Sequence, residues 1–127
     1  MTNYLLVAAG AALGGVLRYG ISGFTQKILP ANFPYGTLAV NVLGTFLLGF
    51  IIFYFDVQGL ISPRLRLLLT IGFCGGFTTF STFAFETAGL LRDSEYLLAF
   101  ANMGLNLFLT LGALALAYLA AKWMIGG

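Results

Sequence analysis

The chain has 127 residues, of which 60% are hydrophobic and only 8% are charged, and its mean hydropathy is +0.98. Water-soluble domains carry about 25% charged residues, so this composition excludes a soluble globule and predicts a protein of the lipid bilayer. The net charge is +2, histidine is absent, and the only cysteine has no disulfide partner within the chain. Transition-metal chemistry and histidine-based catalysis are therefore excluded, and we expect neither an enzyme nor a nucleic-acid partner.

Four apolar runs are each long enough to cross about 30 Å of hydrocarbon as a helix. In chain order they are residues 4–24, 36–55, 65–91 and 96–121. Because the connections are too short to fold outside the membrane, we expect one all-α integral membrane domain over residues 1–127, with its function among the four transmembrane helices. No basic residue precedes the first run, which does not fit a cleaved signal peptide.

Glycine pairs spaced by four residues occur in the first and third runs, at Gly10 and Gly14 and at Gly72 and Gly76. Such spacings let helix backbones approach closely in membranes. We therefore predict tight helix packing at these positions and assign them no chemistry.

Residues 72–83 place three glycines and four hydroxyl side chains inside the third run. In hydrocarbon every backbone N–H and C=O needs a partner, so a helix is interrupted only where protein buries it or where it lines a wet or ion-bearing cavity. The segment predicts a broken third helix and a functional site beside the break.

One polar side chain lies in each run at a similar depth, about 8 to 9 Å below the same surface; these are Arg18, Asn41, Glu86 and Asn102. They predict a polar vestibule confined to one leaflet. Glu86 is a functional candidate because an ionisable group is costly inside a membrane, and pairing with Arg18 is an equally good expectation.

The fourth run carries Asn102, Asn106 and Thr110 at i, i+4 and i+8, which places them on one helix face. Hydrogen bonding between helices explains any one of them equally well. Three in register favour a path lined by uncharged donors, which suits an anion. In the third run, the electropositive ring edges of Phe80 and Phe83 can face such an anion, although simple packing is the alternative.

The basic residues are balanced, with three near each membrane surface. Orientation normally follows an excess of Lys and Arg on the cytoplasmic side, so a balanced chain predicts insertion in both orientations. An inverted second copy would place an equivalent vestibule in the other leaflet. We therefore predict an antiparallel homodimer embedded in membrane lipid.

Three segments, residues 14–19, 36–41 and above all 72–83, resemble those of the Fluc or CrcB family of small four-helix fluoride channels. The resemblance covers essentially the whole chain. It implies a dual-topology homodimer in the bacterial inner membrane, with two pores that export fluoride passively and confer fluoride resistance.

The resemblance also implies roles for particular residues. Phe80 and Phe83 would be the pore phenylalanines, and Asn41 the vestibule asparagine. The remaining pore and vestibule positions are Ser81, Thr82, Asn102, Asn106 and Thr110 in a polar track, and Arg18, Thr37 and Glu86 beside it. The resemblance places the break at residues 75–78, where the backbone carbonyls of Gly75 and Thr78 would hold a structural sodium ion at the centre of the dimer. The track departs from other members, which often carry tyrosine, serine or histidine at the helix-4 positions.

Two other functions fit parts of the sequence. A proton-coupled exporter resembling the small multidrug resistance proteins shares the size and dual topology, but it needs a carboxylate in the first helix, where this chain has Arg18. A structural subunit of a larger complex fits the length and the glycine content but leaves residues 78–83 unexplained.

Overall fold

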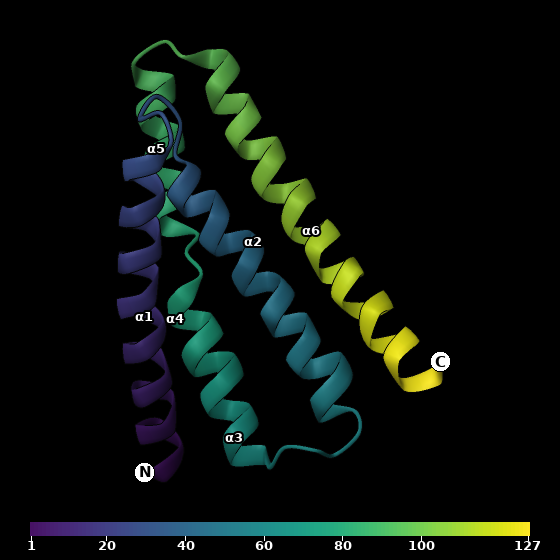
Figure 1. The fold of residues 1–127 in the computed structure, drawn as a ribbon. Coiled ribbons are helices and arrows are strands. Elements are labelled where there is room, and N and C mark those ends of the chain that lie inside the picture. Colours follow the sequence, from purple (N-terminus) through teal and green to yellow (C-terminus); the bar gives the residue numbers. More distant parts are fainter.

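The structure is a computed structural model that describes all residues, 1–127, and it is entirely helical (Figure 1). Its elements are α1 (Thr2–Ile28), α2 (Tyr35–Phe50), the π-helical η1 (Ile51–Asp56), α3 (Pro63–Leu67), the π-helical η2 (Leu68–Cys74), α4 (Gly75–Phe77), α5 (Ser81–Arg92) and α6 (Tyr96–Gly126). Four stretches are long and apolar enough to cross a membrane: Thr2–Ile28, Tyr35–Asp56, Pro63–Arg92 and Tyr96–Gly126. The four predicted spans are thus confirmed.

The ends of the spans follow local sequence signals. The backbone of Leu29 is extended, as expected for a residue that precedes a proline, and α1 stops there. Ser62 caps the third span, because its side-chain oxygen accepts the Leu65 N–H at 3.1 Å and Pro63 occupies the first helical position. These signals fix the end of the first crossing and the start of the third.

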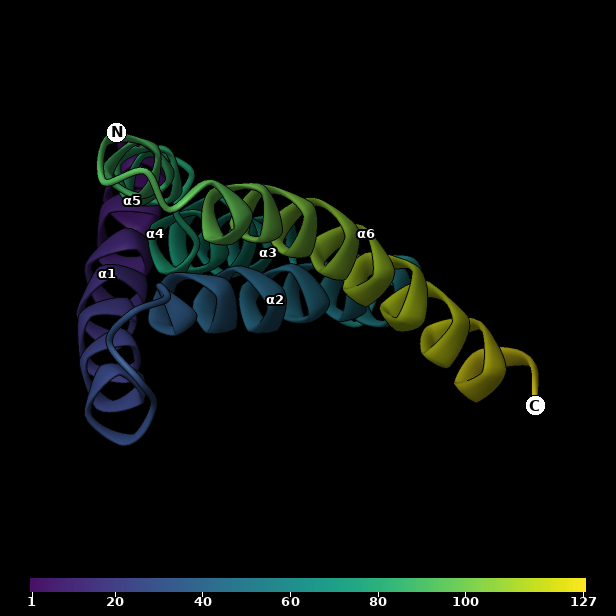
Figure 2. The same cartoon turned by 90° about the horizontal axis from the view of Figure 1, so that it is seen from above.

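The four crossings alternate in direction. The two chain termini and the η1 to α3 connection lie toward the same end of the molecule, and the other two connections lie at the opposite end (Figure 1). Helix α2 packs along α6, while α1 packs along η2 and α4. Seen from above, the C-terminal end of α6 extends beyond the other helices (Figure 2).

Glycine makes the contact between α1 and the third span possible. A Cβ added to Gly10 would lie 2.8 Å from the backbone nitrogen of Phe73, and one added to Gly14 would overlap the Phe73 carbonyl oxygen. On the opposite side of the contact, a Cβ on Gly72 would lie 3.1 Å from the Cα of Gly10. The predicted tight packing is confirmed, and it holds α1 against the segment that leads into the site.

Apolar side chains cover the outside of the bundle and polar ones occupy part of its interior. Val16, Phe85 and Phe108 are 70%, 77% and 71% exposed. The buried polar side chains are Thr37, Asn41, Thr87, Asn102 and Asn106. Water-soluble proteins have the opposite arrangement, so this distribution of side chains suits a lipid environment. The buried polar groups indicate that the functional site lies in the interior between α2, α5 and α6.

Candidate functional site

The third span loses its helical form at Thr78. Helix α4 ends at Phe77 and α5 begins at Ser81, and the backbone of Thr78 is extended. The non-helical stretch, residues 78–80, therefore lies later than the predicted break at residues 75–78 and overlaps it only at Thr78. Gly75–Phe77 is helical, and both the N–H and the hydroxyl of Thr78 still donate to the Cys74 carbonyl, at 3.0 and 2.9 Å.

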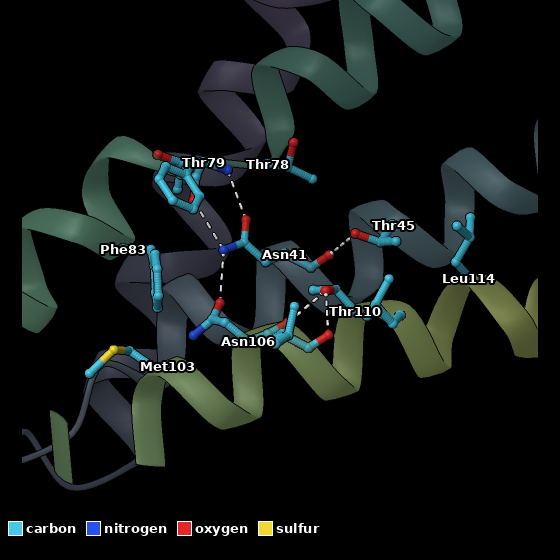
Figure 3. Close-up of a pocket in the computed structure, with 12 residues that line it drawn as sticks. Asn41, Thr45, Thr78, Thr79, Phe83, Met103, Asn106, Thr110 and Leu114 are labelled. Atoms are coloured by element: carbon cyan, nitrogen blue, oxygen red, sulfur yellow. Dashed lines mark hydrogen bonds between the residues drawn. The ribbon is translucent and has the colours of Figure 1, made fainter. Parts of the chain in front are cut away.

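A side chain from another helix replaces the helical hydrogen bonds at this point. The Asn41 Oδ1 atom accepts the backbone N–H of Thr79 at 2.8 Å, and Asn41 Nδ2 donates to the Thr79 carbonyl at 3.0 Å (Figure 3). The amide of Asn41 thus pairs with both polar groups of one residue, as a neighbouring peptide would. It satisfies a backbone that would otherwise be unpaired in hydrocarbon.

Two further side chains form hydrogen bonds with backbone groups near the break. The Thr79 hydroxyl oxygen accepts the N–H of Thr82 at 3.2 Å, and Arg18 Nε donates to the Gly76 carbonyl at 3.0 Å. In a continuous helix the N–H groups of Thr79 and Thr82 would bond to the carbonyls of Gly75 and Thr78. Because both N–H groups are directed to side-chain oxygens instead, these two carbonyls lose their helical donors.

The expected pairing of Arg18 with Glu86 is wrong. The guanidinium of Arg18 bonds to the carbonyl of Gly76, one of the last in α4, where a positive charge is favourable. The ion pairs in the structure join Arg66 to Asp56 at 3.3 Å and Arg92 to Asp93 at 3.7 Å. The Oε1 atom of Glu86 is buried without a hydrogen-bond partner.

A cavity of about 430 Å³ opens beside the break, between α2, α5 and α6 (Figure 3). It is lined by Asn41, Thr45, Thr78, Thr79, Phe80, Phe83, Met103, Asn106, Leu107, Thr110, Leu111 and Leu114. The rings of Phe80 and Phe83 have centroids 5.4 Å apart and are tilted by 52°. Phenylalanine rings, amides and hydroxyls therefore meet in one hollow, which brings together five of the residues expected in the pore: Asn41, Phe80, Phe83, Asn106 and Thr110.

A continuous chain of hydrogen bonds joins Asn41 on α2 to the asparagines of α6 and to Thr87 on α5. Asn41 Nδ2 donates to Asn106 Oδ1 at 3.0 Å, and Asn106 Nδ2 donates to both the backbone oxygen and the Oδ1 of Asn102 at 2.9 Å. Asn102 Nδ2 donates to the hydroxyl oxygen of Thr87 at 2.9 Å. Thr110 stands apart, because its hydroxyl donates only to carbonyls of its own helix.

Thr87 is a residue that the sequence did not single out. Threonines in membrane helices usually bond back to their own helix, as Thr87 does with the Phe83 carbonyl at 2.8 Å, so its residue type gives no signal. Its position four residues after Phe83 places it on the same helix face, but this spacing alone does not reveal its partner Asn102.

A second cavity, of about 350 Å³, lies on the α1 side of the break. It brings together the predicted residues Arg18, Thr37 and Thr82, and Thr79 lines both cavities. The four residues predicted to share one vestibule are not gathered around one cavity: Asn41 lines the first and Arg18 the second, while Glu86 and Asn102 line neither, Asn102 being 0% exposed. Ser81 is exposed and also lines neither cavity.

Comparison with known proteins identifies the family. A family model described as "CrcB-like protein, Camphor Resistance (CrcB)" matches residues 5–118. The chain belongs to the CrcB family. The resemblance seen in the sequence is confirmed, and with four apolar spans this CrcB chain is a multi-pass membrane protein.

Curated relatives of this CrcB chain carry the name "Fluoride-specific ion channel FluC". A relative from Dehalococcoides mccartyi is 47% identical over 111 residues, which cover 87% of this chain and 85% of the relative. Relatives from Geotalea daltonii and Serratia proteamaculans are 43% and 44% identical and cover 98% and 99% of this chain, and 100% and 98% of their own lengths. The relatives are named as channels, which agrees with the expectation that the chain is not an enzyme.

Proposed function

We propose that this chain is a fluoride-selective ion channel of the bacterial inner membrane, which releases cytoplasmic fluoride passively and confers fluoride resistance. The main support for this proposal is the CrcB family match over residues 5–118, together with relatives of similar length that are named as fluoride-specific channels. Hydrogen fluoride crosses membranes as a neutral acid and dissociates in a neutral cytoplasm. A negative-inside potential then favours exit of the anion by about 2.3 kcal/mol per 100 mV, so no pump is needed.

The pathway that we propose runs beside the break. Fluoride is small and strongly hydrated, so a selective pore must replace its water with fixed electropositive groups. The ring edges of Phe80 and Phe83 provide such groups along the first cavity. The hydroxyls of Thr45, Thr78 and Thr110 already donate to backbone carbonyls, whereas the hydroxyl of Thr79, which lines both cavities, accepts the Thr82 N–H and keeps its own hydrogen free. Thr79 is therefore a proposed hydroxyl donor to the ion, together with Ser81 and Thr82 beyond the first cavity.

The second cavity supplies the proposed entrance. Arg18 lies in it together with Thr37, and its positive charge would concentrate anions at the mouth. In the first cavity, Asn41 on α2 and Asn106 and Thr110 on α6 line the proposed path. Asn102 supports this wall from behind, since it is fully buried. Glu86, whose Oε1 atom is buried without a partner, lies beside the path.

Ion efflux from liposomes tests the function. Purified protein is reconstituted as the only protein in vesicles loaded with potassium fluoride, and an ion electrode records release after addition of a potassium ionophore. We expect rapid fluoride efflux and, in a parallel preparation loaded with potassium chloride, almost none. Equal efflux of both ions, or no fluoride efflux, would contradict the proposal.

The same vesicles separate the channel from a proton-coupled exporter. An exporter needs a proton gradient and a titratable carboxylate on its path, whereas a channel conducts without one. Within the membrane spans the only carboxylate away from the span ends is Glu86, on α5. We expect fluoride efflux to persist when a protonophore abolishes the proton gradient, because passive flow depends only on the electrochemical gradient of fluoride itself.

The assembly that we propose is an antiparallel homodimer. The balance of basic residues supports it, as does an open hollow of about 450 Å³ where Gly75 and Thr78 lie near the molecular surface. C-terminal fusions to a cytoplasmic fluorescent reporter and to a periplasmic phosphatase should both give signal. Replacing Lys27 and Arg92 with glutamine removes basic residues from one side, and it should bias every C-terminus toward the cytoplasm. A wild-type chain that inserts in a single orientation would contradict the antiparallel arrangement.

Sodium is the proposed structural ion at the dimer centre. A bound sodium would supply a positive charge that oxygen ligands from two copies share. The carbonyls of Gly75 and Thr78 fit this role, because the N–H groups that would bond to them in a helix donate to Asn41 and Thr79 instead. Carbonyl oxygens are suitable ligands for hard cations. Purification with N-methylglucamine in place of sodium should convert dimer to monomer on size exclusion, and an unchanged profile would count against the ion.

A further inference from the structure

The amide donors that line the first cavity are already used within the protein. Asn41 Nδ2 carries two hydrogens, which go to the Thr79 carbonyl and to Asn106 Oδ1. The two hydrogens of Asn106 Nδ2 both go to Asn102. An anion could take one of these hydrogens only by leaving a buried acceptor unpaired, which is costly. The amides are therefore poor candidates for direct contact with fluoride.

The hydrogen-bonded chain holds both ends of the segment that carries the phenylalanines. At one end Asn41 pairs with the N–H and C=O of Thr79, the residue directly before Phe80. At the other end Asn102 donates to Thr87, whose hydroxyl in turn donates to the carbonyl of Phe83. One continuous set of bonds thus joins α2, α6 and α5 on either side of the two rings.

The ring of Phe80 has little support from the rest of the chain, whereas Phe83 is half-buried. Phe80 is 77% exposed, so its direction depends on the backbone that carries it. That backbone lies outside a helix at residues 78–80 and cannot be held by helical hydrogen bonds alone. The held positions, Thr79 and the turn that begins at Phe83, flank this ring pair, whose centroids are 5.4 Å apart and whose planes are tilted by 52°.

We infer that Asn41, Asn106, Asn102 and Thr87 are positioning residues, which form a clamp that sets the geometry of Phe80 and Phe83 rather than a set of ion ligands. The inference rests on the proposed fluoride channel, which it deepens by assigning the asparagine stripe of α6 a role in selectivity through the rings. Thr87 distinguishes a positioning role from direct contact with the ion. It is 7% exposed and lines neither cavity, so it acts on fluoride only through the clamp.

The test is Thr87→Val, which removes the hydroxyl and keeps the shape of the side chain. We expect fluoride efflux per reconstituted protein to fall about tenfold, the cost of one misplaced contact at a constriction, and the fluoride-to-chloride ratio to fall with it. Thr87→Ser, which restores the hydroxyl, should recover both values. Thr25→Val is the matched control, because the Thr25 hydroxyl also bonds to a carbonyl of its own helix, Ile21 at 2.8 Å, but lies outside the clamp.

A double-mutant cycle separates positioning from general damage. If Thr87 acts through the ring of Phe83, Thr87→Val should change efflux and selectivity much less in a Phe83→Ile background than in the wild type. Equal fold-changes in the two backgrounds would overturn the inference. So would an unchanged selectivity ratio in Thr87→Val alone.

Hydrogen exchange tests the clamp without any transport. In the wild-type protein in detergent, the amide of Thr79 should exchange slowly although it lies between two helices, and Thr87→Val should speed its exchange. An amide of Thr79 that exchanges as fast as those in the loop at residues 57–60 would refute the clamp, even if fluoride efflux is normal. Protected exchange without fluoride efflux would instead refute the proposed function and leave the clamp in place.

Discussion

Replacing Gly14 by valine is expected to destabilise the folded protein by at least about 3 kcal/mol, which is severe for a single substitution. A Cβ at this position overlaps the Phe73 carbonyl oxygen and lies 2.8 Å from the backbone nitrogen of Phe77. Both atoms belong to backbone, so no side-chain rotation relieves the overlap. Separating α1 from the third span would also pull Arg18 away from the Gly76 carbonyl. Unfolding by titration with a denaturing detergent, followed by circular dichroism or Trp123 fluorescence, measures the loss.

The neighbouring glycine supplies the control. A Cβ on Gly15 meets nothing within 4 Å. Gly15→Ala should therefore leave packing intact and raise stability by about 0.5 to 1 kcal/mol, because glycine is unfavourable within a helix. Equal destabilisation by Gly14→Val and Gly15→Ala would show that the close contact between α1 and the third span does not determine stability.

Phe83→Ile is expected to reduce fluoride efflux by up to about tenfold while the protein remains folded. An aliphatic side chain of similar size keeps the apolar surface but has no electropositive edge, and aromatic edge contacts are worth about 0.5 to 1.5 kcal/mol each. Phe80→Ile should act in the same way, because both rings line the first cavity. Efflux from liposomes, normalised to reconstituted protein, gives the ratio.

Phe85→Ile is the matched control for the ring substitutions. Phe85 lies on the same helix and is 77% exposed, as Phe80 is, but it lines neither cavity. We expect its replacement to leave efflux unchanged. Normal efflux in both Phe80→Ile and Phe83→Ile would mean that the rings serve packing alone, and loss of the folded protein in either variant would point the same way.

Features that depend on composition and short spacing were predictable from the sequence. Hydropathy alone located the four spans, because about 20 apolar residues in succession have few alternatives to crossing a bilayer. The glycine spacing predicted the close contact at Gly10 and Gly14, since small residues are what such a contact requires. Residues 72–83 were identified as unusual for the same reason, because a cluster of glycines and hydroxyls is visible without any partner.

Features that depend on a distant partner were not predictable. The break lies at residues 78–80 because Asn41, 38 residues before Thr79, reaches the backbone of Thr79, and nothing near residue 79 signals this. Arg18 had two acceptable partners by depth, Glu86 and a carbonyl at a helix end, and depth does not distinguish them. Thr87 became visible only when Asn102 was placed beside it. Each case needs the rotation of one helix against another, which a single sequence does not specify.

The pairing of Asn41 with Thr79 also bears on how the protein is made. The ribosome delivers α2 before the third span, so the amide is already in the membrane when Thr79 arrives. Residues 63–92 would be a poor independent insertion unit, because two polar backbone groups at their centre need that amide to be paired in lipid. The third crossing therefore depends on the second, because Asn41 pairs the backbone groups of Thr79 that would otherwise oppose insertion. The order of the helices along the chain places this partner in the membrane first.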